Sequence, residues 1–131
     1  MNTRTDRFND VHLHATSVHG WGQTYSQISA GAAQCVLSQF STTRIHAFRE
    51  LINQRVVQHG EAPRGQICFA VPLAVPGAAR VQGRAADDKC IFVLQGGDEF
   101  MFHMPMHMDM LSITFEREAF ERMMAGAPWP T

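Results

Sequence analysis

The sequence predicts a mostly β fold, in which short strands are joined by tight turns and one helix lies near the C-terminal end. Short apolar segments recur along the chain at spacings of roughly ten residues, which is typical of sandwiches, jelly rolls and barrels. Segments rich in glycine and proline separate them and supply the turns. A helical pattern follows the last of the apolar segments.

The composition is that of one ordinary globular domain. The chain has 131 residues, of which 45% are hydrophobic and 18% charged, and this suits a single domain with its own core. The net charge is −1 and the arginines are scattered, so we do not expect a basic nucleic-acid-binding surface. No apolar run is long enough to span a membrane, and the polar N-terminus lacks the core of a signal peptide. We therefore expect a cytoplasmic protein.

Short strands are expected to follow a polar, weakly patterned arm at residues 1–17. The longest strand is residues 43–52, and residues 53–58 could continue it past a kink or bulge. Loops are expected at residues 59–65 and 84–88. The strands are predicted at residues 21–28, 33–40, 43–52, 66–73, 79–83, 90–94, 99–104 and 110–115.

Residues 96–98, Gly-Gly-Asp, are predicted to form a tight turn. Glycine reaches positive φ without a steric penalty, so this turn is typical of a hairpin that joins residues 90–94 and 99–104. Residues 96–100 also spell the signature of diguanylate cyclases. A cyclase would need a second acidic cluster and a phosphate-binding loop, which the sequence lacks, so we interpret the match as a turn only.

Residues 116–125 are predicted to form the helix, which Gly126 would end. Its apolar residues recur at helical spacing and form one stripe, which would pack on the barrel or on a partner chain. The stripe consists of Ala119, Phe120, Met123 and Met124.

The three cysteines are expected to be buried, reduced thiols. Cys35, Cys68 and Cys90 each lie within an apolar run, and they form no CxxC pair.

Methionine and histidine are unusually dense at residues 101–110. In an extended segment the even-numbered methionines would share one face, whereas His103, His107 and Asp109 would share the other. Thioethers and imidazoles together suit copper(I), but this split favours packing of the methionines in the barrel or at an interface. The methionines are Met104, Met106, Met108 and Met110.

Four segments resemble the N-terminal sensor domain of AraC-type transcriptional regulators, in order and in spacing, over roughly residues 8–125. The segments are residues 21–31 (Trp-Gly-Gln-Thr-Tyr-Ser-Gln-Ile-Ser-Ala-Gly), 48–55 (Phe-Arg-Glu-Leu-Ile-Asn-Gln-Arg), 69–73 (Phe-Ala-Val-Pro-Leu) and 94–100 (Leu-Gln-Gly-Gly-Asp-Glu-Phe).

The resemblance implies a cupin-like double-stranded β-helix, a jelly-roll barrel, over residues 18–115, with an arm at 1–17 and a C-terminal helix at 116–126. It also implies a homodimer that binds a small-molecule effector, with no metal and no cofactor. DNA would be bound only through a C-terminal helix-turn-helix domain, which is absent from this chain.

We expect the effector to contact aromatic and polar side chains on barrel strands, although each of them could equally be structural. Trp21 and Tyr25 would give flat walls with a hydrogen-bonding tip. Arg44, His46 and Phe48 share one face of their predicted strand. The candidate residues are Trp21, Tyr25, Arg44, His46, Phe48, Arg55, Phe69 and Phe102, with Arg55 placed to pair with an anionic group.

Two alternatives remain open. The first is a small metal-dependent cupin enzyme, for which His12-x-His14 has the right spacing. This pair lies in the predicted arm without the expected glycine and glutamate, so we favour a solvated arm. The second is a copper-binding protein that uses the Met/His segment. Tightly bound metal would distinguish both from the sensor.

Overall fold

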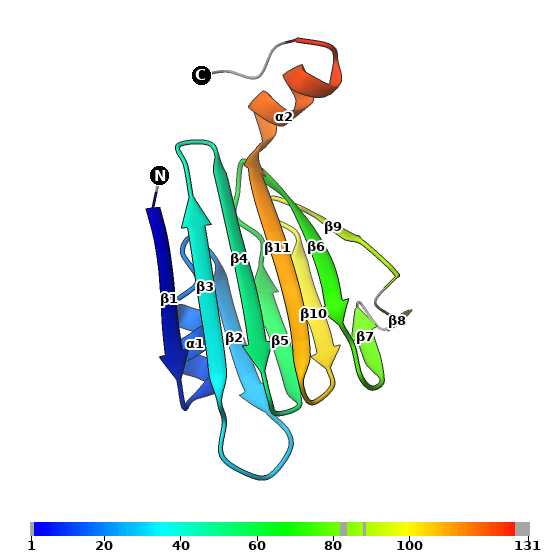
Figure 1. Cartoon of the computed structure of the whole chain (residues 1–131). Helices are drawn as coiled ribbons and strands as arrows, with labels where there is room; N and C mark the ends of the chain where they lie inside the picture. The colour runs from blue at the N-terminus through cyan, green and yellow to red at the C-terminus, as the bar shows by residue number, and fades with distance from the viewer. Residues whose placement is uncertain (1, 82–83, 88, 128–131) are drawn as a thin grey trace.

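The computed structural model describes residues 2–81, 84–87 and 89–127, which form two antiparallel sheets facing each other (Figure 1). Within these residues, one sheet has six strands. Its order is β1 (Asn2–Phe8), β3 (Cys35–Ser41), β4 (Ile45–Ile52), β11 (Met108–Glu116), β6 (Gln66–Ala74) and β9 (Phe92–Gln95).

The second sheet has five strands in the described part of the chain. Its order is β2 (Gly22–Gln27), β5 (Val56–Glu61), β10 (Glu99–Met104), β7 (Ala79–Val81) and β8 (Arg84–Ala86). Buried side chains from both sheets form a large core cluster between them, and Val18, Leu37 and Phe48 form a smaller one.

Side-chain alternation along β4 shows how the core is built. Phe48, Glu50 and Ile52 are buried between the sheets, whereas Arg49 and Leu51 face outward. This is the two-residue period of a strand with one covered face. β4 pairs with β3 on one side and with β11 on the other, so it lies inside its sheet.

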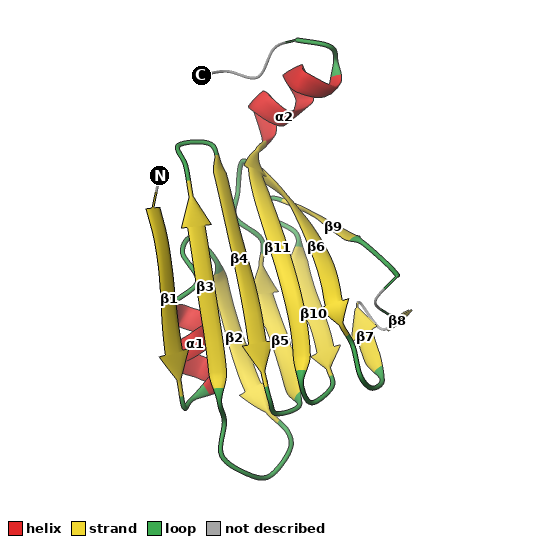
Figure 2. Ribbon diagram, in the orientation of Figure 1, coloured by secondary structure: helices red, strands yellow, loops and turns green. Residues whose placement is uncertain are grey.

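The N-terminal segment, predicted to be a polar arm, is instead part of the folded domain. β1 pairs with β3 along its whole length, and helix α1 (Val11–Thr16) packs against β2, β1 and β3 (Figure 2). The Asp10 carboxylate accepts hydrogen bonds from the backbone amides of His12 and Leu13 and so caps α1. β1 is an edge strand with a mostly exposed, polar sequence, and α1 is too short to reveal a helical period.

The turn at residues 96–98 does not form the predicted hairpin. β9 pairs with β6 in one sheet and β10 pairs with β5 and β7 in the other, so the turn carries the chain from one sheet across to the other. Gly97 has φ 89, as the predicted positive φ requires. A Cβ on Gly96 would lie 2.8 Å from the Gln66 carbonyl oxygen, so close packing against the loop before β6 also requires glycine here.

Three further boundaries differ from the prediction. The chain turns after β4, and β5 begins at Val56 in the other sheet, so residues 53–58 do not prolong β4 and residues 59–61 are strand rather than loop. β6 ends at Ala74, one residue beyond the strand predicted at 66–73, and its pairing with β11 shifts register between Asp109 and Met110. Residues 84–86 form strand β8; residues 82–83 of the strand predicted at 79–83 lie outside the described residues.

The C-terminal helix is confirmed as α2 (Arg117–Met124), and Gly126 follows it with φ 91. Ala119 is buried, and Phe120 packs on Phe69 and Phe115, so part of the predicted stripe covers one end of the barrel. Met123 and Met124 are exposed in the isolated chain. Neither helix in the described ranges is long and apolar enough to cross a membrane.

Candidate functional site

A small cavity lies between the two sheets, with a volume of about 10 Å³. Its wall combines five aromatic side chains with four polar ones, and two small or apolar residues complete it. The lining residues are Trp21, Tyr25, Phe48, Phe100 and Phe102, then Gln23, Glu50, Gln58 and Ser112, and finally Ala70 and Leu94.

Glu50 is the centre of this wall. It lies on the inner face of β4 and is only 4% exposed. The Tyr25 hydroxyl of β2 donates a hydrogen bond to the Glu50 carboxylate, with its oxygen 2.9 Å from both carboxylate oxygens. The bond therefore bridges the two sheets and gives the buried carboxylate a donor.

Burial keeps the Tyr25 phenol in its donor form. Loss of hydration raises its pKa well above the ordinary value, and the neighbouring negative charge of Glu50 raises it further. The neutral phenol is thus available to hydrogen-bond with Glu50 through the physiological pH range.

Helix α1 brings a histidine to the same carboxylate. His14 is fully buried, and its Nε2 lies 3.6 Å from Glu50 Oε2, beyond an ordinary hydrogen bond. Its ring stacks on Tyr25 with 5.9 Å between centroids. The Gln23 side-chain amide also donates to the Ala15 carbonyl oxygen of α1, at 3.2 Å. The segment expected to be a solvated arm therefore supplies a buried side of the site.

Several buried polar atoms here have no hydrogen-bond partner in the described residues. They are both ring nitrogens of His14 and Nε1 of Trp21. Buried donors and acceptors are nearly always paired in folded proteins, so a group of unpaired ones close to a buried carboxylate indicates a site that awaits a polar partner.

Aromatic rings close the remaining sides. Trp21 meets both Phe48 and Phe100 edge to face, with 5.6 Å between centroids in each pair. Phe102 extends this wall from Phe100 at 5.0 Å. The arrangement provides flat apolar surfaces around one acidic group.

A larger hollow of about 920 Å³ is an open groove at a different part of the surface. Exposed Arg7, Asn9 and Leu13 border it, and buried Cys35 and Met108 form part of its floor. We place the candidate site in the interior because the buried carboxylate and the unpaired polar atoms are there.

The structure brings together four of the residues that the sequence singled out: Trp21, Tyr25, Phe48 and Phe102 all line the interior cavity. Whether they contact a ligand remains a prediction.

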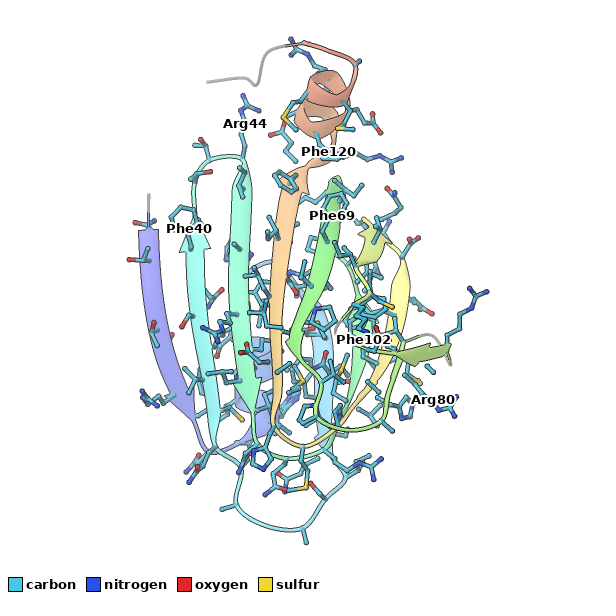
Figure 3. All side chains as sticks on the ribbon, turned by 45° about the vertical axis from the view of Figure 1, so that its right-hand side comes forward. Phe40, Arg44, Phe69, Arg80, Phe102 and Phe120 are labelled. Atoms are coloured by element: carbon cyan, nitrogen blue, oxygen red, sulfur yellow. The ribbon has the colours of Figure 1, made fainter. Side chains whose placement is uncertain are left out.

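The other four candidates lie away from the cavity. Arg44 pairs with Glu116 at 2.9 Å beside α2 (Figure 3). Arg55 is exposed. His46 is half-buried, stacks on Phe48 and bonds with Oε1 of Gln39 at 3.0 Å, and burial lowers its pKa. Phe69 points to the outer face of β6, because inner and outer residues alternate there.

Glu50 was the main residue that sequence reasoning missed, although a signal existed. It follows Phe48 by two residues, so the same strand period that places Phe48 inside also places Glu50 inside. His14 gave no such signal, because a six-residue helix is too short for a pattern.

The Met/His segment is divided between two strands, close to those predicted at residues 99–104 and 110–115. β10 ends at Met104 and β11 starts at Met108, and His107 takes φ 60 in the turn between them. Met104, Met108 and Met110 pack in the core, as expected for thioether packing, whereas Met106 is 41% exposed. Among residues 2–81, 84–87 and 89–127, no three or more His, Cys, Asp and Glu side chains gather in a way that could hold a metal ion.

All three cysteines are free, but only two are buried. Burial raises the pKa of the Cys35 and Cys68 thiols to about 11. Cys90, predicted to be buried, is exposed because it precedes β9 rather than forming part of it. Its thiol lies 3.3 Å from Asp87 Oδ1.

No protein-family model matches the chain, and no curated protein matches it in sequence. Solved structures do resemble it. The AraC-like transcriptional activator CuxR superposes with a TM-score of 0.69 at 7% identity, covering 95% of this chain and 51% of that one. A predicted oxalate decarboxylase from Thermotoga maritima gives 0.51 at 9% identity, covering 78% of this chain and 96% of that one. The EutQ protein of Clostridium difficile gives 0.50 at 10% identity, covering 66% and 71%.

The fold is cupin-like. This confirms the predicted jelly-roll barrel with a C-terminal helix, and the fold resemblance to an AraC-like regulator. The chain spans about half the length of CuxR. Because a transcriptional activator and a predicted decarboxylase share this fold, the fold alone does not decide whether the chain is an enzyme.

Proposed function

We propose that this chain is the effector-binding and dimerisation domain of a cytoplasmic AraC-type transcriptional regulator, and that the interior cavity is the effector site. The observation that carries the proposal is the buried Glu50 carboxylate, held by Tyr25 and surrounded by unpaired polar atoms and aromatic walls. The similarity to CuxR along 95% of this chain supports the regulatory class over other uses of the fold.

The route from the site to the end of the chain is short. Ser112 of β11 lines the cavity, and the same strand runs on to Glu116 and into α2. An effector that favours one position of β11 would thereby favour one position of α2. The mechanism is a shift between two populated arrangements, driven by the difference in effector affinity between them.

Helix α2 has a free apolar edge for a second protomer. Met123 and Met124 are 38% and 69% exposed, although they belong to the same amphipathic helix as buried Ala119. In the proposed homodimer these side chains contribute to the contact between protomers, and DNA is bound by a further domain outside this chain.

The proposal is tested with the purified chain by a thermal-shift screen of small metabolites, followed by calorimetry and light scattering. We expect at least one compound to bind with a stoichiometry of one per chain, and a dimer in solution. Loss of that binding in Tyr25→Phe would place the compound in the interior. A monomeric chain that binds none of the compounds would overturn the proposal.

A small metal-dependent cupin enzyme is the second candidate, because the predicted decarboxylase superposes over 78% of this chain. Metal analysis by mass spectrometry, with iron and copper add-back, separates the two. About one tightly held metal ion per chain would favour the enzyme or, for copper, a metal-binding protein.

A further inference from the structure

The lining of the cavity contains one carboxylate and no lysine or arginine. Glu50 is the charged side chain among the residues that line the cavity, and its other lining residues are neutral or aromatic. Arg49, its neighbour on β4, points outward and pairs with Asp109 on the outer surface. The strand period thus keeps the guanidinium on the opposite face of the sheet from the carboxylate.

In the described part of the chain no arginine or lysine pairs with Glu50, and the imidazole of His14 is the basic group at ion-pair distance from it. Its hydrogen-bond donor is the neutral Tyr25 hydroxyl, and the His14 ring nitrogen lies 3.6 Å away. A buried carboxylate is strongly disfavoured unless a positive charge and several hydrogen bonds compensate for its lost hydration. A ligand that carries a positive charge and N–H donors would supply both.

The aromatic side chains favour the same kind of ligand. Trp21, Phe48, Phe100 and Phe102 form a connected set around the cavity, with neighbouring centroids 5.0–5.6 Å apart. The faces of aromatic rings attract cations, most strongly where water is excluded. A carboxylate ligand would instead be repelled by the like charge of Glu50.

We infer that the effector is a small organic amine that binds in its protonated form, with its ammonium group on Glu50 and its carbon skeleton between the aromatic walls. The inference rests on the proposed function, since it takes the interior cavity as the effector site.

Trp21 is the side chain that must move to admit this ligand. The present cavity has room for about one water molecule, but a hollow of about 510 Å³ lies on the outer side of Trp21. Trp21 lines both spaces, and the indole N–H has no hydrogen bond to lose when the ring turns. Gly20, with φ 84, precedes it, and no atom lies within 4 Å of the position that a Cβ on Gly20 would take. Turning the indole would therefore join the outer hollow to the Glu50 cavity.

The test compares the binding of ligands that differ in charge but have nearly the same shape. Primary amines from ethylamine to benzylamine are titrated into the chain, alongside their neutral N-acetyl derivatives and carboxylates of equal size. The Trp129→Phe background leaves Trp21 as the single indole, so tryptophan fluorescence reports on its movement, while calorimetry reports affinity.

Glu50→Gln tests the carboxylate with almost no change in shape. Asp109→Asn makes the same chemical change on the outer face of β11 and is the matched control. We expect at least one amine to bind and to change Trp21 fluorescence, with its N-acetyl derivative much weaker. Glu50→Gln should weaken amine binding about tenfold or more, and Asp109→Asn should leave it unchanged.

Two results would overturn the amine inference and leave the sensor proposal standing: tight binding of neutral or anionic compounds instead of amines, or amine binding that Glu50→Gln does not alter. The comparison of amines with their amides uses the unaltered interior, so it decides the question even where Glu50→Gln folds poorly. By contrast, a monomeric chain that binds no compound of any charge would remove the sensor proposal as well.

Discussion

Two aromatic clusters in this molecule look alike in sequence but differ in what surrounds them. The inner cluster, Trp21 with Phe48, Phe100 and Phe102, encloses the Glu50 carboxylate and has a buried, unpaired N–H. The outer cluster consists of Phe69, Phe115 and Phe120, with ring centroids 5.4–5.9 Å apart. Its contacts pack α2 against the end of the barrel, where Figure 3 shows Phe69 and Phe120.

The difference teaches that aromatic residues on strands do not by themselves mark a ligand site. Phe69 and Phe102 were both expected to contact the effector, yet only Phe102 lines the interior. The distinguishing feature is the buried polar group at the centre of the inner cluster. Four substitutions or conditions test this comparison.

The largest effect is expected for Phe102→Ala. The side chain is 4% exposed, so its removal leaves a cavity in the core and should lower the free energy of unfolding by about 3–5 kcal/mol. Urea denaturation measures the change. A loss below about 1 kcal/mol would mean that the inner cluster is loosely packed rather than part of the rigid core.

Tyr25→Phe should cause the second-largest loss of stability. It removes the hydroxyl donor from the buried Glu50 carboxylate and changes little else, with an expected loss of about 1–3 kcal/mol in the free energy of unfolding. The same denaturation experiment applies, with Asp109→Asn as a surface control expected to lose less than about 1 kcal/mol. Equal losses in the two variants would contradict the special role of the interior pair.

Phe120→Ala tests the outer cluster. Because this ring is only partly buried, its removal should reduce the free energy of unfolding by about 1–2 kcal/mol, less than Phe102→Ala. Light scattering should also show a weaker dimer if α2 contributes to the contact between protomers. A stability loss as large as that of Phe102→Ala would show that the outer cluster is as essential to the fold as the inner one.

The smallest effect on stability at neutral pH is expected from the buried thiols of Cys35 and Cys68. Burial raises the pKa of Cys35 and Cys68 from 9.0 to about 11, so their contribution to stability is complete below pH 9 and is lost as the pH rises toward 11. The free energy of unfolding should therefore fall between pH 9 and 11, and less steeply in a Cys35→Ala, Cys68→Ala variant. Identical pH profiles would show that these thiols ionise equally in both states.

The sequence was a good guide to local structure and a poor guide to pairing. The Gly96-Gly97 turn and α2 both occur where predicted. The hairpin expected at that turn does not occur, because the hydrogen-bond partners of β9 and β10 lie far away in the chain. Edge strand β1 was missed because its sequence is mostly polar and exposed, and its position depends on tertiary contacts with β3 and α1.

By itself the sequence determined the β class and the C-terminal helix, since each depends on the spacing of neighbouring residues. Only the tertiary structure decided that Tyr25 and His14 meet Glu50, because these residues come from β2, α1 and β4 in different layers. It also decided that Phe69 lies outside and Phe102 inside. The sequence specifies the functional group of each residue, but the residues that it contacts depend on which strands the two sheets bring together.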